Sequence, residues 1–151
     1  MVTEDYVSFD IAKLLKEKGF KHWCYKCYGD AVYHKGTPIS FDEECELKDG
    51  GLEDEIEYVE GYLYDFGCDN RKKDAKVYAA PTLQMAMKWL REVHDKSIEI
   101  RSEGLKATSI GWVVGIYNLK NQEEEYHHPY TFSTYEQACE AAIKYCLEKL
   151  I

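Results

Sequence analysis

Two cysteines three residues apart are the first feature that could carry chemistry. Cys24 and Cys27 lie in the stretch WCYKCY (residues 23–28), and both redox proteins and zinc sites use this spacing. A reactive thiolate needs the start of a helix, where amide dipoles lower its pKa, and a structural zinc ion needs further Cys or His ligands. Here the helical pattern precedes the pair and no second Cys-x-x-Cys follows. We predict a strand with packed thiols, and thiol-redox or metal binding at Cys24 and Cys27 is the alternative.

A second group of metal-ligand residue types lies near the C-terminal end of the sequence. His127 and His128 follow three consecutive glutamates, residues 123–125. Adjacent histidines do not easily share one ion, and the group lacks the i, i+4 spacing of a helical histidine site. A solvated loop is the better interpretation, with a metal site as the alternative.

Other catalytic signatures do not stand out in the sequence. It contains no nucleophile elbow, phosphate-cradling glycine loop or dinucleotide fingerprint. We therefore name no catalytic residue, expect no cofactor and lean against an enzyme. The thirteen tyrosines leave open a small-molecule-binding protein or enzyme with a tyrosine-lined pocket.

Acidic residues are concentrated in residues 42–60. This segment holds ten acidic residues and one lysine, which equals the net charge of −9 of the whole chain. A solvated loop is one interpretation, and a surface for a basic partner protein is the other. Because the chain has no basic stripe to offset these carboxylates, direct binding of nucleic acid is disfavoured.

Length and composition predict one globular domain over residues 1–151, with the acidic segment as an insertion at about 42–60. No stretch approaches the roughly 18 apolar residues that a membrane span needs. The N-terminus also lacks the basic and apolar parts of a signal peptide. We expect a cytoplasmic protein without membrane contact, and we expect all six cysteines to be reduced.

Hydrophobic periodicity places three helices and four to five strands. Ser8, Thr82 and Thr134 are predicted N-caps of helices that begin at Phe9, Leu83 and Tyr135. The predicted strands are WCYKCY and residues 31–34, joined by a two-residue turn at Gly29-Asp30, then residues 56–66, 97–103 and 111–119. The order α-β-β, acidic insertion, α-β-β-α indicates an α+β fold with an antiparallel sheet.

The second predicted helix is apolar over an unusually wide arc. Leu83, Ala86, Met87, Leu90 and Val93 share one face of residues 83–94. Met85 and Trp89 lie beside this face and widen the apolar arc to roughly 200°. Either loops cover this flank or another protein does.

Three blocks of sequence resemble a known family. The blocks are EDYVSFDIAKLLKEKGF (residues 4–20), APTLQMAMKWLREVHDKSIEI (80–100) and YEQACEAAIKYCLEKLI (135–151). Together they resemble a family of small uncharacterised proteins from gut bacterial genomes and from their phages and mobile elements. The resemblance implies an accessory protein of a mobile element and carries over no catalytic residues.

The leading hypothesis is a non-catalytic protein that binds another protein. A second copy of the chain is also a candidate partner. The candidate interaction residues, on the flank of residues 83–94 and in and after the acidic segment, are Met85, Trp89, Glu53, Asp54, Glu55, Tyr58 and Tyr62.

Overall fold

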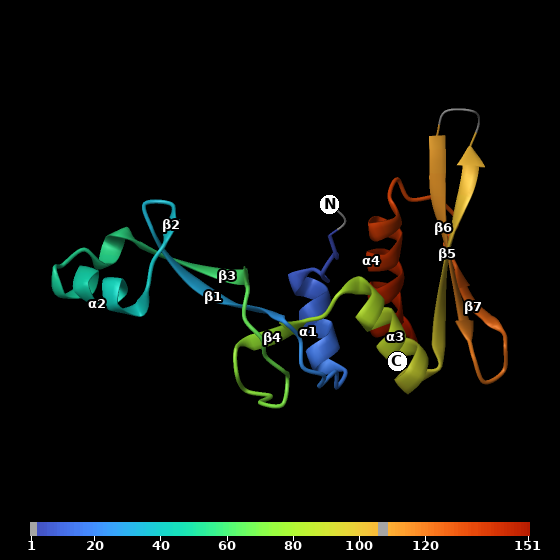
Figure 1. Ribbon diagram of the computed structural model, residues 1–151, viewed down its shortest axis with the longest axis horizontal. Helices are drawn as coiled ribbons and strands as arrows, with labels where there is room; N and C mark the ends of the chain where they lie inside the picture. Colours follow the sequence, from blue (N-terminus) through green and yellow to red (C-terminus); the bar gives the residue numbers. More distant parts are fainter. Residues whose placement is uncertain (1–2, 106–108) are drawn as a thin grey trace.

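A computed structural model describes residues 3–105 and 109–151 and confirms the α+β class, with four α-helices and two antiparallel sheets among these residues (Figure 1). The elements are α1 (Phe9–Glu17), β1 (Lys26–His34), β2 (Thr37–Pro38), α2 (Phe41–Asp49), the 3₁₀ turn η1 (Glu53–Glu55), β3 (Ile56–Tyr64), β4 (Val77–Ala80), α3 (Leu83–His94), β5 (Lys96–Leu105), β6 (Ser109–Asn118), β7 (Glu124–His127), α4 (Tyr135–Tyr145) and the π-helical turn η2 (Cys146–Leu150). The loop predicted between β5 and β6 includes residues 106–108, which lie outside the described residues.

The predicted helix starts are confirmed by their capping bonds. The hydroxyl oxygens of Ser8, Thr82 and Thr134 accept hydrogen bonds from backbone amides three residues on, at 3.4, 3.2 and 3.1 Å. Each bond satisfies an amide that has no partner within its helix. At the other end of α1, Gly19 adopts φ +94°, a left-handed conformation that glycine tolerates.

The first sheet is built around β1, which runs without a turn from Lys26 to His34. The predicted hairpin turn at Gly29-Asp30 is therefore wrong. Gly29 pairs with Tyr62 of β3 on one side and with Val77 of β4 on the other, so tertiary hydrogen bonds hold it in the strand. The register shifts between Gly29 and Ala31, and Gly61 of β3 adopts φ +74° at this β-bulge.

The paired strands β1 and β3 carry α2 away from the rest of the molecule. In Figure 1 their ribbons run out from the body and α2 lies at the far end. We call residues 27–66 the arm and residues 40–58, with α2 and η1, the tip. Most of the acidic segment lies in the tip and forms a helix, a 3₁₀ turn and the start of β3. The interpretation of residues 42–60 as a solvated loop therefore does not describe this segment.

Helices α1, α3 and α4 lie between the arm sheet and the second sheet, whose strand order is β5-β6-β7 (Figure 1). The core contains fully buried side chains from all three helices, among them Leu15, Leu90 and Ile143. Trp89 also belongs to this core, whereas Val93, predicted to face inward, is 55% exposed. Among the described residues, no helix has the length and apolar character to cross a membrane.

Candidate functional site

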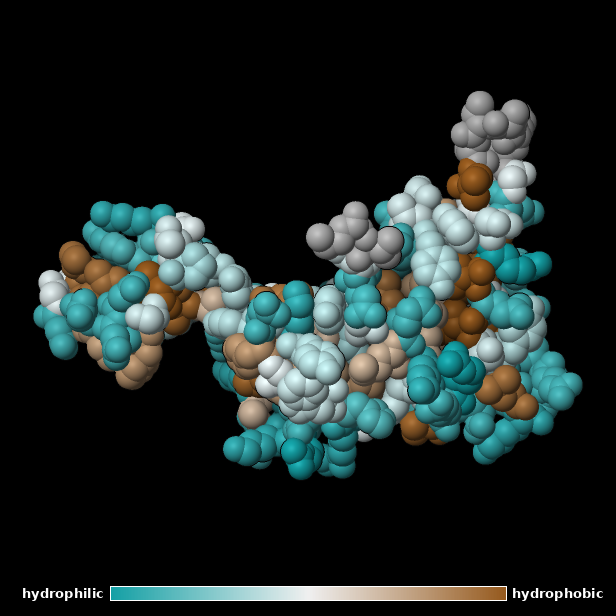
Figure 2. Space-filling view, in the orientation of Figure 1, coloured by the Kyte–Doolittle hydropathy of each residue, from teal (hydrophilic) through white to brown (hydrophobic). Residues whose placement is uncertain are grey.

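The tip brings exposed aromatic and apolar side chains together with carboxylates. Phe41 at the start of α2 is 76% exposed, Tyr58 of β3 is 59% exposed and Leu52 is 42% exposed. Figure 2 shows apolar atoms between hydrophilic side chains at this end of the molecule. Large apolar side chains that gather on a projecting surface are typical of a contact site for another molecule.

Local contacts hold the tip in shape. The Tyr58 hydroxyl donates to the Glu44 carboxylate at 2.8 Å, and Lys48 pairs with the same carboxylate at 2.8 Å. These hydrogen bonds, the one from Lys48 first, lower the pKa of Glu44 and keep it ionised. They tie α2 to β3, so the exposed ring of Phe41 sits on an ordered helix.

The predicted acidic candidates Glu53, Asp54 and Glu55 form η1 and are all exposed. Glu55 also contacts the His34 ring, with 2.8 Å between Nε2 and Oε2, and this hydrogen bond lowers the pKa of Glu55. The structure therefore brings these carboxylates to the same part of the molecule as Phe41 and Tyr58.

Tyr58 and Tyr62 do not form one surface. Four residues apart, they would share a face of a regular strand, but Tyr58 pairs with Val32 and Tyr62 with Gly29, so the bulge places them on opposite faces. Tyr62 belongs instead to a row of rings along the arm, in which neighbouring centroids are 4.7 to 6.3 Å apart. The row consists of Tyr33, Tyr62, Tyr64 and Phe66.

The two predicted interaction residues on α3, Trp89 and Met85, also differ in how much of each side chain a partner could reach. Trp89 is 6% exposed and its ring packs edge-to-face on Phe20, with centroids 5.4 Å apart, so little of it is left for a partner. Met85 is 37% exposed and borders an open groove of about 450 Å³ beside α3. Exposed Trp23 and Val93 also line this groove, and Trp89 forms part of its wall.

Cys27 forms a disulfide with Cys68, not a site with Cys24. The prediction that all six cysteines are reduced is wrong for this pair. The chain returns after β3 and places the two Cα atoms 6.1 Å apart, a distance that a disulfide spans. Disulfides are typical of oxidising compartments, so cytoplasmic location stays a prediction.

Cys24 is buried next to this disulfide. Its backbone amide donates to the Cys68 carbonyl at 2.8 Å, and the Cys68 amide returns the bond at 3.0 Å. Burial raises the pKa of the Cys24 thiol to about 11, which keeps it protonated at neutral pH. The geometry gives Cys24 a packing role and none of the features of an activated nucleophile.

Part of the predicted loop is a strand, because Glu124–His127 forms β7 and pairs with β6, and His128 follows directly after it. His127 Nδ1 lies 3.4 Å from Glu124, while His128 Nδ1 lies 2.8 Å from the carbonyl oxygen and 3.2 Å from the amide of Tyr130, and its tautomer decides which of the two it bonds. Across residues 3–105 and 109–151, no group of three or more His, Cys, Asp or Glu side chains is placed to hold a metal ion.

Glu125 in this strand forms a largely buried ion pair with Lys96. Both carboxylate oxygens lie within 2.8 Å of the Lys96 amine, and the Asn118 side chain donates to the same carboxylate at 2.9 Å. The hydrogen bond from Lys96 is the main cause that lowers the pKa of Glu125. Lys96 is 9% exposed, so loss of the partner would leave a buried, unpaired charge.

We expect Glu125→Gln to lower the free energy of unfolding at neutral pH by about 2 kcal/mol, since the amide keeps a hydrogen bond but not the charge. Because folding lowers the pKa of Glu125, its contribution is present above the pKa of an unfolded glutamate, about 4.3. It is lost as the pH falls through the lower pKa of the folded state. Urea denaturation at neutral and acidic pH measures this, with exposed Glu99→Gln as the control. An equal loss at both pH values would contradict it.

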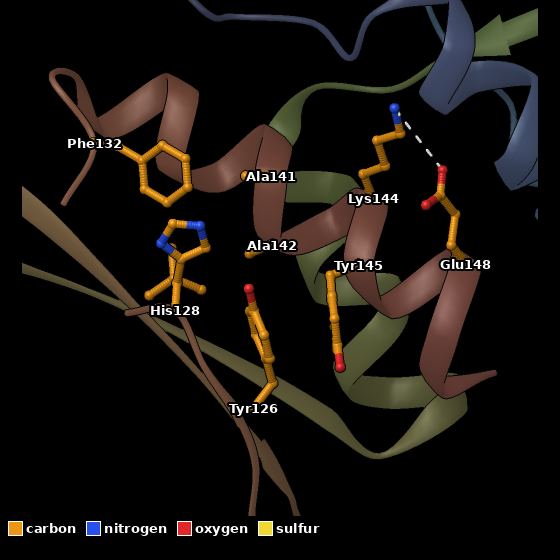
Figure 3. Close-up of a pocket in the computed structure, with 9 residues that line it drawn as sticks. Tyr126, His128, Phe132, Ala141, Ala142, Lys144, Tyr145 and Glu148 are labelled. Atoms are coloured by element: carbon orange, nitrogen blue, oxygen red, sulfur yellow. Dashed lines mark ion pairs between the residues drawn. The ribbon is translucent and has the colours of Figure 1, made fainter. Parts of the chain in front are cut away.

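An aromatic-walled cavity lies between β7 and α4 (Figure 3). The sequence left a tyrosine-lined pocket open but did not indicate which residues would line it. It measures about 240 Å³. Tyr126 stacks on Tyr145 with centroids 3.7 Å apart, and His128 packs on Phe132 at 4.6 Å. In Figure 3 the Tyr126 hydroxyl points toward Ala142 of α4. The alternation of aromatic residues at 126, 128 and 130, followed by Phe132, was the available signal.

Comparison of the chain with protein-family models, with curated proteins and with solved structures gives no match.

Proposed function

We propose that the protein is non-catalytic and acts by binding a basic partner protein through the tip. One observation carries this proposal: the arm projects a surface on which exposed Phe41, Leu52 and Tyr58 stand among exposed carboxylates. A few residues carry most of the binding energy of a protein interface, and large aromatic side chains such as tyrosine are enriched among them. Surrounding charge of one sign raises the association rate with an oppositely charged surface. The resemblance to proteins of phages and mobile elements suggests an accessory role in such an element.

The test compares affinity capture from the native host by three forms of the protein at low salt. The tip variant is Glu53→Lys, Asp54→Lys, Glu55→Lys. The matched control reverses three exposed carboxylates of the body, Glu99→Lys, Glu103→Lys, Glu136→Lys.

We expect a partner that the wild type and the control retain and that the tip variant loses. With that partner purified, the tip variant should bind at least roughly tenfold more weakly. Phe41→Ala should also weaken binding while every charge stays in place. If all forms capture the same proteins with equal affinity, the tip is not the binding surface.

A second candidate function is the binding of a small planar molecule in the aromatic cavity, which the inward-facing Tyr126 hydroxyl favours. A bound ligand at a hundred times its Kd would stabilise the fold by about 2.7 kcal/mol. Thermal unfolding with indole and p-cresol as probes tests this. A rise in Tm that Ala141→Leu abolishes supports the site, whereas an unchanged Tm contradicts it for this ligand class.

A further inference from the structure

Charges of opposite sign stand at the two ends of the arm. The acidic residues of the tip lie at the far end. Where the arm joins the body, residues 9–26 and 69–78 contain nine lysines and arginines and only four carboxylates. We call these two segments the base. Its basic residues are Lys13, Lys16, Lys18, Lys21, Lys26, Arg71, Lys72, Lys73 and Lys76.

Folding brings these basic segments onto one surface. The Lys16 amine donates to the carbonyls of Ala75 and Val77, the latter at 2.9 Å, which fastens α1 to the chain that leads into β4. As a result three lysines, Lys13, Lys16 and Lys73, line one open cavity of about 280 Å³ together with a single carboxylate, Glu17. Folding therefore joins basic residues of both segments on one surface. The sequence showed no basic stripe because these residues come from two segments about fifty residues apart.

The tip cannot neutralise the base of its own chain. β1 has nine residues and rises about 3.3 Å per residue, so roughly 30 Å separates the ends of the arm. Hydrogen bonds to β3 on one side and to β4 and β2 on the other keep β1 extended. At physiological salt, charges are screened over about 8 Å, so each end attracts only what comes close to it.

We propose that the tip binds the base of a second copy of this chain, in a symmetric pair in which each tip contacts the other copy's base. This inference rests on the proposed function, since it uses the same tip and names its partner. Charge complementarity selects the second copy, because the chain itself carries a surface of the sign that the tip requires. Phe41 and Leu52 supply apolar area to the contact, which charge alone would leave weak.

Two-fold symmetry allows the assembly to close at two chains. When the two arms lie antiparallel, a single two-fold rotation places the tip of each copy on the base of the other copy. Both tips and both bases are then occupied, so no surface of this kind remains free to bind a third chain. The net negative charge of each copy lies in its acidic segment. In this arrangement the two tips stand about one arm length apart, roughly 30 Å, so screening weakens their mutual repulsion while each tip contacts a base directly.

The experiment measures the mass of the purified full chain by analytical ultracentrifugation over a range of protein and salt concentrations. The tip variant Glu53→Lys, Asp54→Lys, Glu55→Lys is compared with a base variant, Lys13→Glu, Lys72→Glu, Lys73→Glu. All six side chains are exposed, and circular dichroism checks that both variants are folded.

We expect the wild type to form dimers that dissociate as salt rises. Each variant alone should dimerise at least roughly tenfold more weakly, because the three reversed side chains then face charges of their own sign at both contacts. An equimolar mixture of the two variants should regain the dimer, since its contacts again join opposite charges. Phe41→Ala should weaken the wild-type dimer without changing any charge.

Three outcomes would overturn the inference. The wild type could be monomeric at every concentration, the reversals could leave a dimer unchanged, or the mixed variants could stay monomeric. If the wild type is monomeric while a host partner still depends on the tip, the self-association fails and the proposed function stands. If the tip variant self-associates and captures host proteins as the wild type does, the self-association and the proposed function are both wrong.

Discussion

Cys27→Ala is expected to lower the free energy of unfolding by about 4 kcal/mol, a shift in Tm of roughly 10 °C. The Cys27–Cys68 disulfide closes a loop with a sequence separation of 41 residues, which contains the whole arm. A bond that closes a loop of this length restricts the unfolded chain and so stabilises the folded one. Urea denaturation with and without a thiol reductant measures the effect.

Reduction of the wild type should lower the free energy of unfolding by about as much as Cys27→Ala does, because both remove the same cross-link. Cys45→Ala is the control, since Cys45 is half-buried on α2 and not part of a disulfide. That variant should keep its sensitivity to reductant. Thiol titration in denaturant should find four thiols before reduction, those of Cys24, Cys45, Cys139 and Cys146. The prediction would be refuted by six titratable thiols before reduction. It would also be refuted by the same free energy of unfolding with and without reductant.

Gly61→Ala is expected to destabilise the protein by about 3 kcal/mol, from two separate causes. Gly61 adopts φ +74° at the bulge of β3, a conformation that costs an alanine about 1–2 kcal/mol. A Cβ atom at this position would also stand 2.5 Å from Cδ2 of Phe9 on α1. Gly61 is thus a point of close approach between β3 of the arm and α1.

Gly36→Ala separates the two causes. Gly36 has nearly the same φ, +77°, but a Cβ there would have no heavy atom within 4 Å. We therefore expect Gly36→Ala to cost only about 1 kcal/mol, from backbone strain alone. Chemical denaturation of both variants gives the comparison. Equal losses would mean that the contact with Phe9 contributes nothing.

The arm depends on both of these features. The disulfide joins β1 to the segment after β3. The close approach of Gly61 to Phe9 packs β3 against α1. A variant weakened at either place should present the tip less rigidly. The charge-reversal variants keep both features, so their effects on binding report on the tip surface itself.

One missed element left a signal in the sequence. α2 begins at Ser40-Phe41-Asp42, the same three residue types as Ser8-Phe9-Asp10 at the start of α1. The Ser40 hydroxyl accepts from the Glu43 amide at 3.2 Å, as an N-cap does. The dense negative charge of the following residues favoured a loop, but acidic side chains in a first turn also suit the positive end of a helix.

The side chains of α3 show that hydrophobic periodicity along a helix does not always predict which residues are buried. On a helical wheel Val93 belongs to the apolar face and Trp89 lies beside it, yet Trp89 is buried and Val93 is exposed. The reason is the position of Phe20, which packs on the Trp89 ring from a distant part of the chain. A wheel describes one helix and not the neighbours that cover it.

By itself the sequence determined the starts of α1, α3 and α4, two strands of the second sheet, β5 and β6, and the location of the net charge. Capping and composition act within a few residues, so they can be read locally. Tertiary structure alone decided that β1 runs through Gly29, that Cys27 pairs with Cys68 and that the bulge parts Tyr58 from Tyr62. Each of these depends on contacts between segments tens of residues apart, where local propensity carries no information.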